Sequence, residues 1–287
     1  MTNIRLIATD MDGTLLNSER KISKANAEAI RYAESKGITV AVATGRDYTE
    51  AIAPLKEAGL RLPLICVNGA EMRSRDGQIL SQAPLDKTLY NQMSAILREE
   101  NVYYEMYTTK GSFTENQQKG IDIVVNIMMS TGEFATYDEV MKVAEARFKE
   151  GAVSVTDDYQ SVLTNDVKIY KLLAFSEDDG SRERAKQRLL DLSEVSVSAS
   201  ASENLEITHL QATKGKALEK LAKDLDVSIR ETMALGDNLN DVSMLSIAGV
   251  SVAMKNGEDE VKKISDRVTA SNVEDGVAKA IYDLIDQ

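Results

Sequence analysis

The 287-residue sequence is poor in the side chains on which many enzyme sites are built. It contains one cysteine, Cys66, one histidine, His209, and no tryptophan. A lone cysteine excludes an internal disulfide and suits a reducing compartment. Zinc sites and catalytic triads that need several histidines are excluded too, as are cysteine clusters. Cys66 lies in the apolar run PLICVNGA, where we expect a buried hydrophobic residue and not a nucleophile.

Basic side chains are also in deficit. The sequence has 34 Lys and Arg against 46 Asp and Glu, which gives a net charge of −12. This balance argues against nucleic acid or an anionic membrane as the main partner, although a metal ion or one lysine can still attract a small anion. No apolar run approaches the roughly 18 residues of a membrane span. The first residues, MTNIRLIATD, are too short and too soon charged for a signal peptide, so we expect a cytoplasmic protein.

The first part of the sequence alternates short apolar runs with helical patterns. Buried strands are predicted at residues 4–9, 38–44 and 62–70. Between them, Ser23 can cap a helix that Gly37 closes, and Asp47 can open a second helix. Alternating strands and helices are typical of a parallel sheet covered on both faces.

Two local signals modify this pattern. Pro54 predicts a kink or a break in the helix that Asp47 opens. Asp76 and Gly77 lie between two alternating runs and predict a hairpin.

From about Pro84 the pattern changes, and after about Thr208 the first pattern returns. The middle part mixes helical patterns with alternating runs, of which the serine-rich run 195–202 is predicted to be a strand with one polar face. The last part predicts helices at 214–225, 240–249 and 273–286, and strands at 232–237 and 250–254. We therefore predict an α/β protein: a Rossmann-like core domain of residues 1–83 and 209–287, split by an inserted α+β cap domain of residues 84–208.

Polar side chains follow the predicted core strands where each strand ends. In an open parallel sheet, ligands bind beyond the carboxyl ends of the strands. Lys214, which opens a predicted helix, can join the same edge. The residues at the strand ends are Asp10 and Asp12, then Thr44, Gly45 and Arg46, then Asn68 and Gly69, and finally Asp237, Asn240 and Asp241.

This set of side chains suits phosphoryl transfer. A carboxylate can attack phosphorus and form an aspartyl phosphate, and a second acid two residues away can move the proton. A divalent cation relieves the repulsion between carboxylate and phosphate, and hard oxygen ligands select Mg²⁺. Each signal also has a purely structural explanation. Asp10 and Asp12 can form a turn, Thr44 and Gly45 can end a strand, Lys214 can be a solvated helix residue, and Asp237 and Asp241 can cap a helix.

The order of four motifs resembles a known family. The stretches DMDGTLL, TGR, a later KG and GDNLNDVSML occur in the order found in the haloacid dehalogenase superfamily of phosphatases. The insertion between the second and third motifs resembles the large α/β cap of the Cof-type subfamily, which includes bacterial sugar phosphatases. The resemblance extends over essentially the whole chain.

The resemblance implies a role for each matching residue. Asp10 is the expected nucleophile and Asp12 the expected general acid and base. The expected Mg²⁺ ligands are Asp10, the backbone carbonyl of Asp12, and Asp237, and Asp241 is expected to support both the metal and Lys214. The residues expected to bind phosphate or substrate are Thr44, Gly45, Arg46, Asn68, Gly69, Lys214 and Asn240.

The function expected from the sequence is hydrolysis of a small phosphorylated metabolite, such as a sugar phosphate, with the cap closing over the site. A phosphosugar mutase remains an alternative, because mutases of this superfamily also carry the second aspartate. A non-catalytic protein that binds a phosphorylated ligand is another alternative. The sequence indicates neither a nucleic-acid nor a membrane partner, and it leaves the oligomeric state open.

Overall fold

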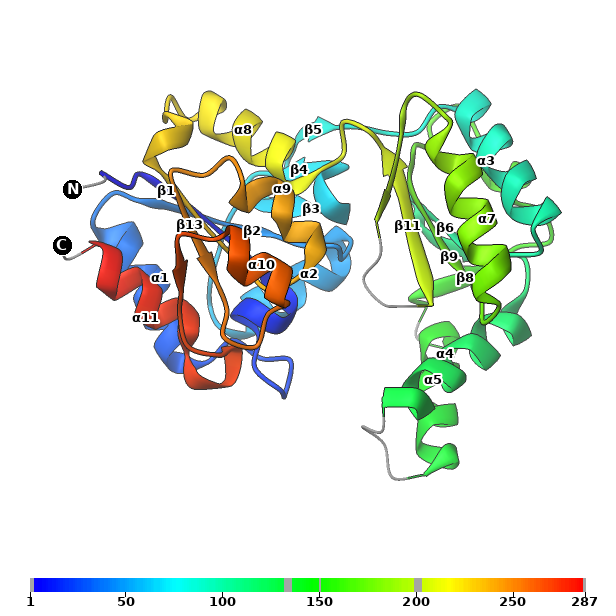
Figure 1. The fold of residues 1–287 in the computed structure, drawn as a ribbon, viewed down its shortest axis with the longest axis horizontal. Coiled ribbons are helices and arrows are strands. Elements are labelled where there is room, and N and C mark those ends of the chain that lie inside the picture. Colours follow the sequence, from blue (N-terminus) through cyan, green and yellow to red (C-terminus); the bar gives the residue numbers. More distant parts are fainter. Residues whose placement is uncertain (1–2, 132–135, 150, 199–202, 286–287) are drawn as a thin grey trace. The chain divides into compact units, whose positions relative to one another are not determined.

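The computed structural model describes residues 3–131, 136–149, 151–198 and 203–285. The chain forms two compact units, each of which is described by itself. The core unit comprises Met1–Ala83 and Gln211–Gln287, and the inserted unit comprises Pro84–Leu210. The inserted unit is drawn in cyan to yellow-green in Figure 1.

The core unit is built on an eight-stranded sheet with the order β14-β13-β12-β1-β2-β3-β4-β5. Strands β14 to β3 run parallel, and β4 and β5 are antiparallel additions that form the predicted hairpin. The strands are β1 (Leu6–Asp10), β2 (Thr39–Ala43), β3 (Leu64–Cys66), β4 (Glu71–Arg73), β5 (Ile79–Gln82), β12 (Thr232–Gly236), β13 (Val250–Ala253) and β14 (Arg267–Val268).

Helices cover both faces of this sheet, as predicted. Leu6 and Ala8 of β1 belong to an apolar cluster with residues of α8, α9 and α10, and successive strand residues face opposite sides. Helices α1 and α11 pack against each other, with the rings of Tyr32 and Tyr282 5.3 Å apart. The core helices are α1 (Lys24–Ser35), α2 (Tyr48–Glu57), α8 (Lys214–Asp224), α9 (Val242–Leu245), α10 (Asp259–Ile264) and α11 (Gly276–Ile285).

The inserted unit has a six-stranded sheet with the order β10-β11-β9-β6-β7-β8. Its strand pairs are antiparallel except β7 with β8. The unit therefore has the α+β character expected from the sequence. The strands are β6 (Tyr103–Thr108), β7 (Gly111–Thr114), β8 (Val153–Val155), β9 (Ile169–Phe175), β10 (Val195–Ser198) and β11 (Asn204–His209).

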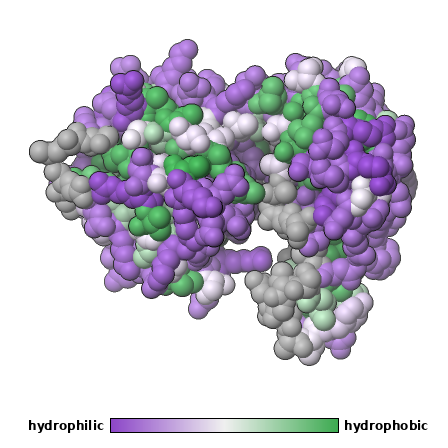
Figure 2. All heavy atoms as spheres, viewed as in Figure 1, coloured by the Kyte–Doolittle hydropathy of each residue, from purple (hydrophilic) through white to green (hydrophobic). Residues whose placement is uncertain are grey.

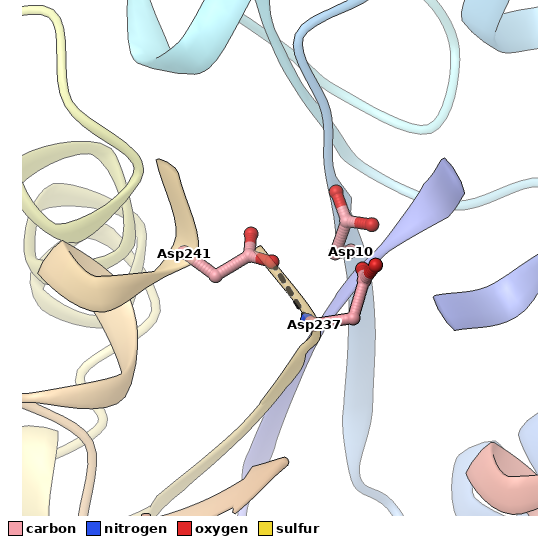
Figure 3. Close-up of side chains that lie close together, drawn as sticks. All are labelled: Asp10, Asp237 and Asp241. Carbon is pink, nitrogen blue, oxygen red and sulfur yellow. Dashed lines mark hydrogen bonds between the residues drawn. The ribbon is translucent and has the colours of Figure 1, made fainter. Parts of the chain in front are cut away.

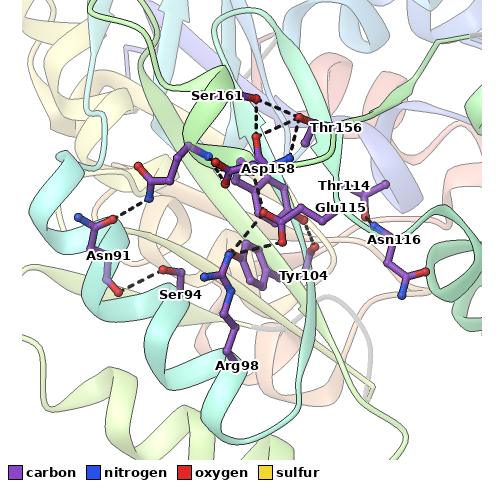
Figure 4. Close-up of polar contacts among 12 residues, drawn as sticks. Asn91, Ser94, Arg98, Tyr104, Thr114, Glu115, Asn116, Thr156, Asp158 and Ser161 are labelled. Carbon is purple, nitrogen blue, oxygen red and sulfur yellow. Dashed lines mark hydrogen bonds and ion pairs between the residues drawn. The ribbon is translucent and has the colours of Figure 1, made fainter.

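Helices α3 and α7 bury an apolar cluster against this sheet, and Ile123 of α4 contacts Tyr103 and Phe175. A polar network ties α3 to the end of β7 and to α6 (Figure 4): Glu115 pairs with Arg98 and accepts a 2.8 Å hydrogen bond from the backbone N–H of Tyr159. The helices are α3 (Lys87–Glu99), α4 (Gln117–Thr131), α5 (Tyr137–Lys149), α6 (Tyr159–Val162) and α7 (Asp179–Leu190).

Several predicted elements differ in the structure. Helix α2 continues through Pro54 to Glu57, so the predicted break is wrong. A proline removes only one helical hydrogen bond, and the buried side chain of Pro54 packs with the core. The predicted helix 240–249 is reduced to one 3₁₀ turn, Leu239–Asp241, followed by the short α9, Val242–Leu245.

One predicted strand is also shorter than expected. The third core strand ends at Cys66, and residues 67–69 form a tight turn instead. In the serine-rich run, β10 spans Val195–Ser198, and residues 199–202 lie outside the described residues.

On the face shown in Figure 2, hydrophilic side chains predominate and hydrophobic residues form only small groups. Within the described ranges, no helix combines the length and apolar character needed to cross a bilayer.

Candidate active site

The strand order brings the predicted site residues to one edge of the core sheet. Strands β12, β1, β2 and β3 are parallel neighbours, so their carboxyl ends lie side by side. Asp10 ends β1, and Thr44, Val67 and Asp237 directly follow β2, β3 and β12. Residues that are far apart in the sequence therefore lie close together at one edge of the core sheet.

Lys214 is the buried centre of this edge. Its side chain is 0% exposed, and its Nζ donates to Asp10 Oδ1 at 2.5 Å and to Asp241 Oδ1 at 2.6 Å. Burial opposes the charged form, but the two carboxylates together raise the pKa of Lys214 above its ordinary value. A lysine in the first turn of a helix gains nothing from the helix dipole. Here the two carboxylates account for its position.

Asp241 organises the loop that follows β12. Its Oδ2 accepts backbone N–H groups from Asp237 at 2.9 Å and from Asn238 at 3.1 Å, while its Oδ1 accepts from Lys214. Figure 3 shows the bond to Asp237 N as a dashed line. Asp241 therefore acts as the first-turn acid of the capping box that Asn238 opens, and as a partner of Lys214.

Asp10, Asp237 and Asp241 each offer one carboxylate oxygen within 4.8 Å of the others. Figure 3 shows the side chains of Asp10, Asp237 and Asp241 close together. Burial raises the pKa of Asp237 to about 6 and the pKa of Asp10 well above its usual range. Two carboxylates this close, one buried and one partly buried, are ionised together only when positive charge compensates them. An all-oxygen set of this kind fits a hard divalent cation such as Mg²⁺.

Thr14 supports Asp237 from the loop after β1. Its Oγ1 donates to Asp237 Oδ1 at 2.8 Å. This hydrogen bond joins the loop after β1 to the loop after β12. This contact fixes one oxygen of the carboxylate cluster.

The side chain of Asp12 lies apart from the three clustered carboxylates. Both of its oxygens accept from Arg46, Oδ2 from Nε at 2.8 Å and Oδ1 from Nη2 at 2.6 Å. Burial works against the charged guanidinium, but the hydrogen bonds and charge of Asp12 raise the pKa of Arg46. Metal binding by Asp12 was expected through its backbone carbonyl. The pairing of its side chain with Arg46 is compatible with that expectation.

Thr44, Asn68 and Asn240 complete the polar lining of the edge. Thr44 is fully buried, and its Oγ1 accepts from the backbone N–H of Arg46 at 3.1 Å, so its hydroxyl proton remains available to donate. Asn240 Nδ2 donates to Asn68 Oδ1 at 3.2 Å. Asn240 Oδ1 is buried without a hydrogen-bond partner in the described part of the chain. Gly45 lies beside Asn68, where a Cβ would approach Asn68 Oδ1 at 3.3 Å.

Two glycines let the loops approach each other closely. Gly13 has φ +77°, and a Cβ there would collide with the carboxylate of Asp237. Gly69 has φ +104°, and a Cβ there would collide with the backbone carbonyl of Thr213, directly before Lys214. Both positions combine a positive φ with a close contact, so they require glycine.

Sequence reasoning missed two features of the edge. Asn256 Nδ2 donates to the backbone carbonyl of Gly13 at 2.8 Å, and the Asn256–Gly257 turn after β13 could have suggested it. Val67 has φ +49°, a strained conformation for a β-branched residue, and it is followed by Asn68 at φ +54°, a conformation that asparagine tolerates. No local pattern in the sequence indicates that strain.

Comparison with known proteins agrees with this geometry. A sequence model of the haloacid dehalogenase-like hydrolases matches residues 7–281. This chain belongs to that family. Its strand-end motifs and inserted α/β unit place it in the Cof-type branch of the haloacid dehalogenase superfamily, as the resemblance predicted.

Curated relatives of this Cof-type hydrolase are phosphatases. The chain is 33% identical to the phosphatase YwpJ of Bacillus subtilis over 285 residues, which covers 98% of this chain and all of the relative. It is 33% identical over 283 residues to the B. subtilis 5-amino-6-(5-phospho-D-ribitylamino)uracil phosphatase YwtE, with 98% of each protein covered. A solved haloacid dehalogenase-like hydrolase from B. subtilis matches with a TM-score of 0.85 at 33% identity, covering 98% of this chain and all of that one. The protein is thus a phosphoric monoester hydrolase of this family.

Proposed function

We propose that this protein is a Mg²⁺-dependent phosphatase that hydrolyses a small phosphorylated metabolite through an aspartyl phosphate on Asp10. The observation that carries the proposal is the buried pairing of Asp10 with Lys214 beside Asp237 and Asp241. An oriented carboxylate next to a lysine and a cation-binding set suits attack on a phosphate ester. The family and the phosphatase relatives support the same chemistry.

The proposed reaction has two steps. First, a carboxylate oxygen of Asp10 bonds to phosphorus, the bond from phosphorus to the leaving oxygen breaks, and that oxygen takes a proton from Asp12. Then a water oxygen bonds to phosphorus, Asp12 takes a proton from the water, and the bond between Asp10 and phosphorus breaks. Asp12 thus returns to its starting protonation state, and inorganic phosphate leaves.

Neighbouring residues supply the rest of the phosphoryl site. An ammonium has three N–H donors, and the two bonds of Lys214 to Asp10 and Asp241 leave one for a phosphoryl oxygen. The hydroxyl of Thr44 can donate to another. A Mg²⁺ ion held by Asp10, Asp237 and the backbone carbonyl of Asp12 would neutralise the carboxylates and the phosphate.

The proposed substrate is a phosphorylated sugar, polyol or similar metabolite. This class follows from the named substrate of the relative YwtE, which carries a phosphorylated ribityl chain. The net charge of −12 disfavours a nucleic-acid partner, and the single cysteine suits a reducing compartment such as the cytoplasm.

The test is phosphate release from a panel of sugar, polyol and cofactor phosphates and p-nitrophenyl phosphate, with Mg²⁺ and with EDTA. Wild type, Asp10→Asn and the matched control Asp283→Asn, an exposed site on α11, are compared. We expect metal-dependent release that Asp10→Asn abolishes and Asp283→Asn retains. Asp10 phosphorylation is checked by trapping the intermediate with radiolabelled substrate.

Other results would point elsewhere. Transfer between positions of one sugar, with total ester phosphate conserved and a bisphosphate activator required, would show a mutase. Tight binding of a phosphorylated ligand with no turnover by the folded, Mg²⁺-loaded protein would show a non-catalytic binding protein.

A further inference from the structure

Arg46 clamps the carboxylate of Asp12 through two parallel hydrogen bonds. Nε and Nη2 of Arg46 contact the two oxygens of Asp12 at 2.8 and 2.6 Å. This arrangement matches the planar fork of a guanidinium to the plane of a carboxylate and fixes orientation as well as distance. The side chain of Asp12 is 52% exposed, so without this pair it would be free to take several rotamers.

The clamp itself is anchored in the core unit. The backbone N–H of Arg46 donates to Thr44 Oγ1 at 3.1 Å, and its carbonyl accepts from the backbone N–H of Val67 at 2.9 Å. The Arg46 side chain is only 21% exposed. The loop after β2 thus holds a nearly fixed guanidinium toward the loop after β1.

The two aspartates of the DMD motif pair with different basic side chains. Lys214 contacts Asp10 and Asp241, whereas Arg46 contacts Asp12. Asp12 takes the Nε–H donor and one Nη2–H donor of the Arg46 guanidinium, the pair that forms its planar fork. A carboxylate oxygen has two lone pairs, so the clamped Asp12 can still exchange a proton on its other side.

We propose that Arg46 is the positioning residue of Asp12, and that it acts on the reaction through Asp12 and not by binding the transferring phosphoryl group. This inference rests on the proposed function, in which Asp12 moves the proton. It replaces the sequence-based assignment of Arg46 to phosphate or substrate binding.

The test compares Arg46→Ala and Arg46→Lys with Asp12→Asn and the double variant Asp12→Asn/Arg46→Ala. The matched control is Arg61→Ala, which removes an exposed Arg–Asp pair of 2.8 Å elsewhere in the core unit. A sugar phosphate needs a proton on its leaving oxygen, whereas p-nitrophenolate does not. We expect Arg46→Ala to lower kcat on the sugar phosphate by about 10²-fold, within the usual range for acid–base catalysis.

With p-nitrophenyl phosphate, Arg46→Ala is expected to retain a rapid burst of p-nitrophenol followed by slow turnover, because only the water-activating step still needs Asp12. The double variant is expected to be no slower than Asp12→Asn, since the two residues act as one unit. Arg46→Lys is expected to recover little, because a lysine cannot hold both oxygens. Thermal unfolding of each variant establishes that it is folded.

Binding of inorganic phosphate, measured by calorimetry with Mg²⁺ present, gives a readout that does not depend on turnover. Arg46→Ala is expected to bind phosphate within about threefold of wild type, since no strong contact is removed. A loss of tenfold or more, or additive losses in the double variant, would overturn the inference. Failure of the proposed function is distinct: wild type and Asp10→Asn would then behave alike, and the inference on Arg46 would fall with it.

Discussion

The core unit and the inserted unit both bury charged side chains, but they place them differently. In the core unit, Glu71 of β4 pairs with Arg73 of the same strand, but Asp10, Asp241 and Lys214 lie at strand and helix ends. In the inserted unit, the buried charges lie within strands: Lys171 of β9 pairs with Glu206 of β11 at 3.4 Å. Buried charge at a strand end can meet a substrate, whereas buried charge within a strand holds the sheet together.

A second pair in the inserted unit has the same character. Arg147 of α5 contacts Glu105 of β6 at 3.0 Å, and Glu105 also accepts from the hydroxyls of Tyr103 and Tyr107. These contacts join a helix of the inserted unit to the sheet of the same unit. We therefore assign them to stability and not to the proposed chemistry.

The largest expected effect tests this comparison directly. Lys214→Met leaves Asp10 and Asp241 without their shared cation, and we expect phosphatase activity to fall by about 10³-fold or more. Lys171→Met leaves Glu206 without that ion pair, and we expect a loss of about 3–5 kcal/mol in the free energy of unfolding. Steady-state kinetics measures the activity of each variant, and urea unfolding measures its free energy of unfolding. If Lys214→Met and Lys171→Met both fold and lose activity equally, the buried charges of the two units do not differ in role.

Two glycines with nearly the same φ provide a sharper comparison. Gly69 of the core unit has φ +104° and Gly111 of the inserted unit has φ +107°, but only Gly69 would bring a Cβ into collision with backbone. Gly111→Ala is expected to cost about 1–3 kcal/mol from backbone strain alone. Gly69→Ala is expected to cost more and also to lower kcat, because Thr213 and then Lys214 must move. Equal destabilisation with unchanged kcat for Gly69→Ala would contradict this reason.

The smallest expected effect is a pH dependence that belongs to the core unit. Without metal, the pKa of Asp237 in the folded protein is raised to about 6, above its ordinary value of 3.8. The folded state then holds a proton that the unfolded state releases, so this group destabilises the metal-free protein as pH rises from about 4 to 6. Mg²⁺ is expected to raise Tm more at pH 7.5 than at pH 5, because the ion competes with that proton.

The control for this prediction is Asp237→Asn, which removes the titrating group. Its metal-free Tm is expected to change less than that of wild type between pH 4.5 and 7 in scanning calorimetry. An unchanged pH profile in this variant would assign the effect to another group.

The fold and much of the site followed from the sequence because their signals are local. Apolar runs ending in Asp10, Thr44 and Asp237 predicted strands, and the carboxyl ends of parallel strands meet by topology alone. The Asp76–Gly77 turn and the capping residues Ser23 and Asp47 were also local signals, and the structure confirmed these caps. Pro54 was misleading, because burial outweighed one lost helical hydrogen bond.

The sequence by itself determined which residues stand at the sheet edge; only the tertiary structure decided which atoms each of them holds. Lys214 and Asp10 are 204 residues apart, Thr14 and Asp237 are 223 apart, and Arg46 and Asp12 are 34 apart. Strand and helix signals come from neighbours a few residues away, so they fix elements and turns. Hydrogen bonds between distant side chains depend on how the packed loops approach one another, and no local pattern records that geometry.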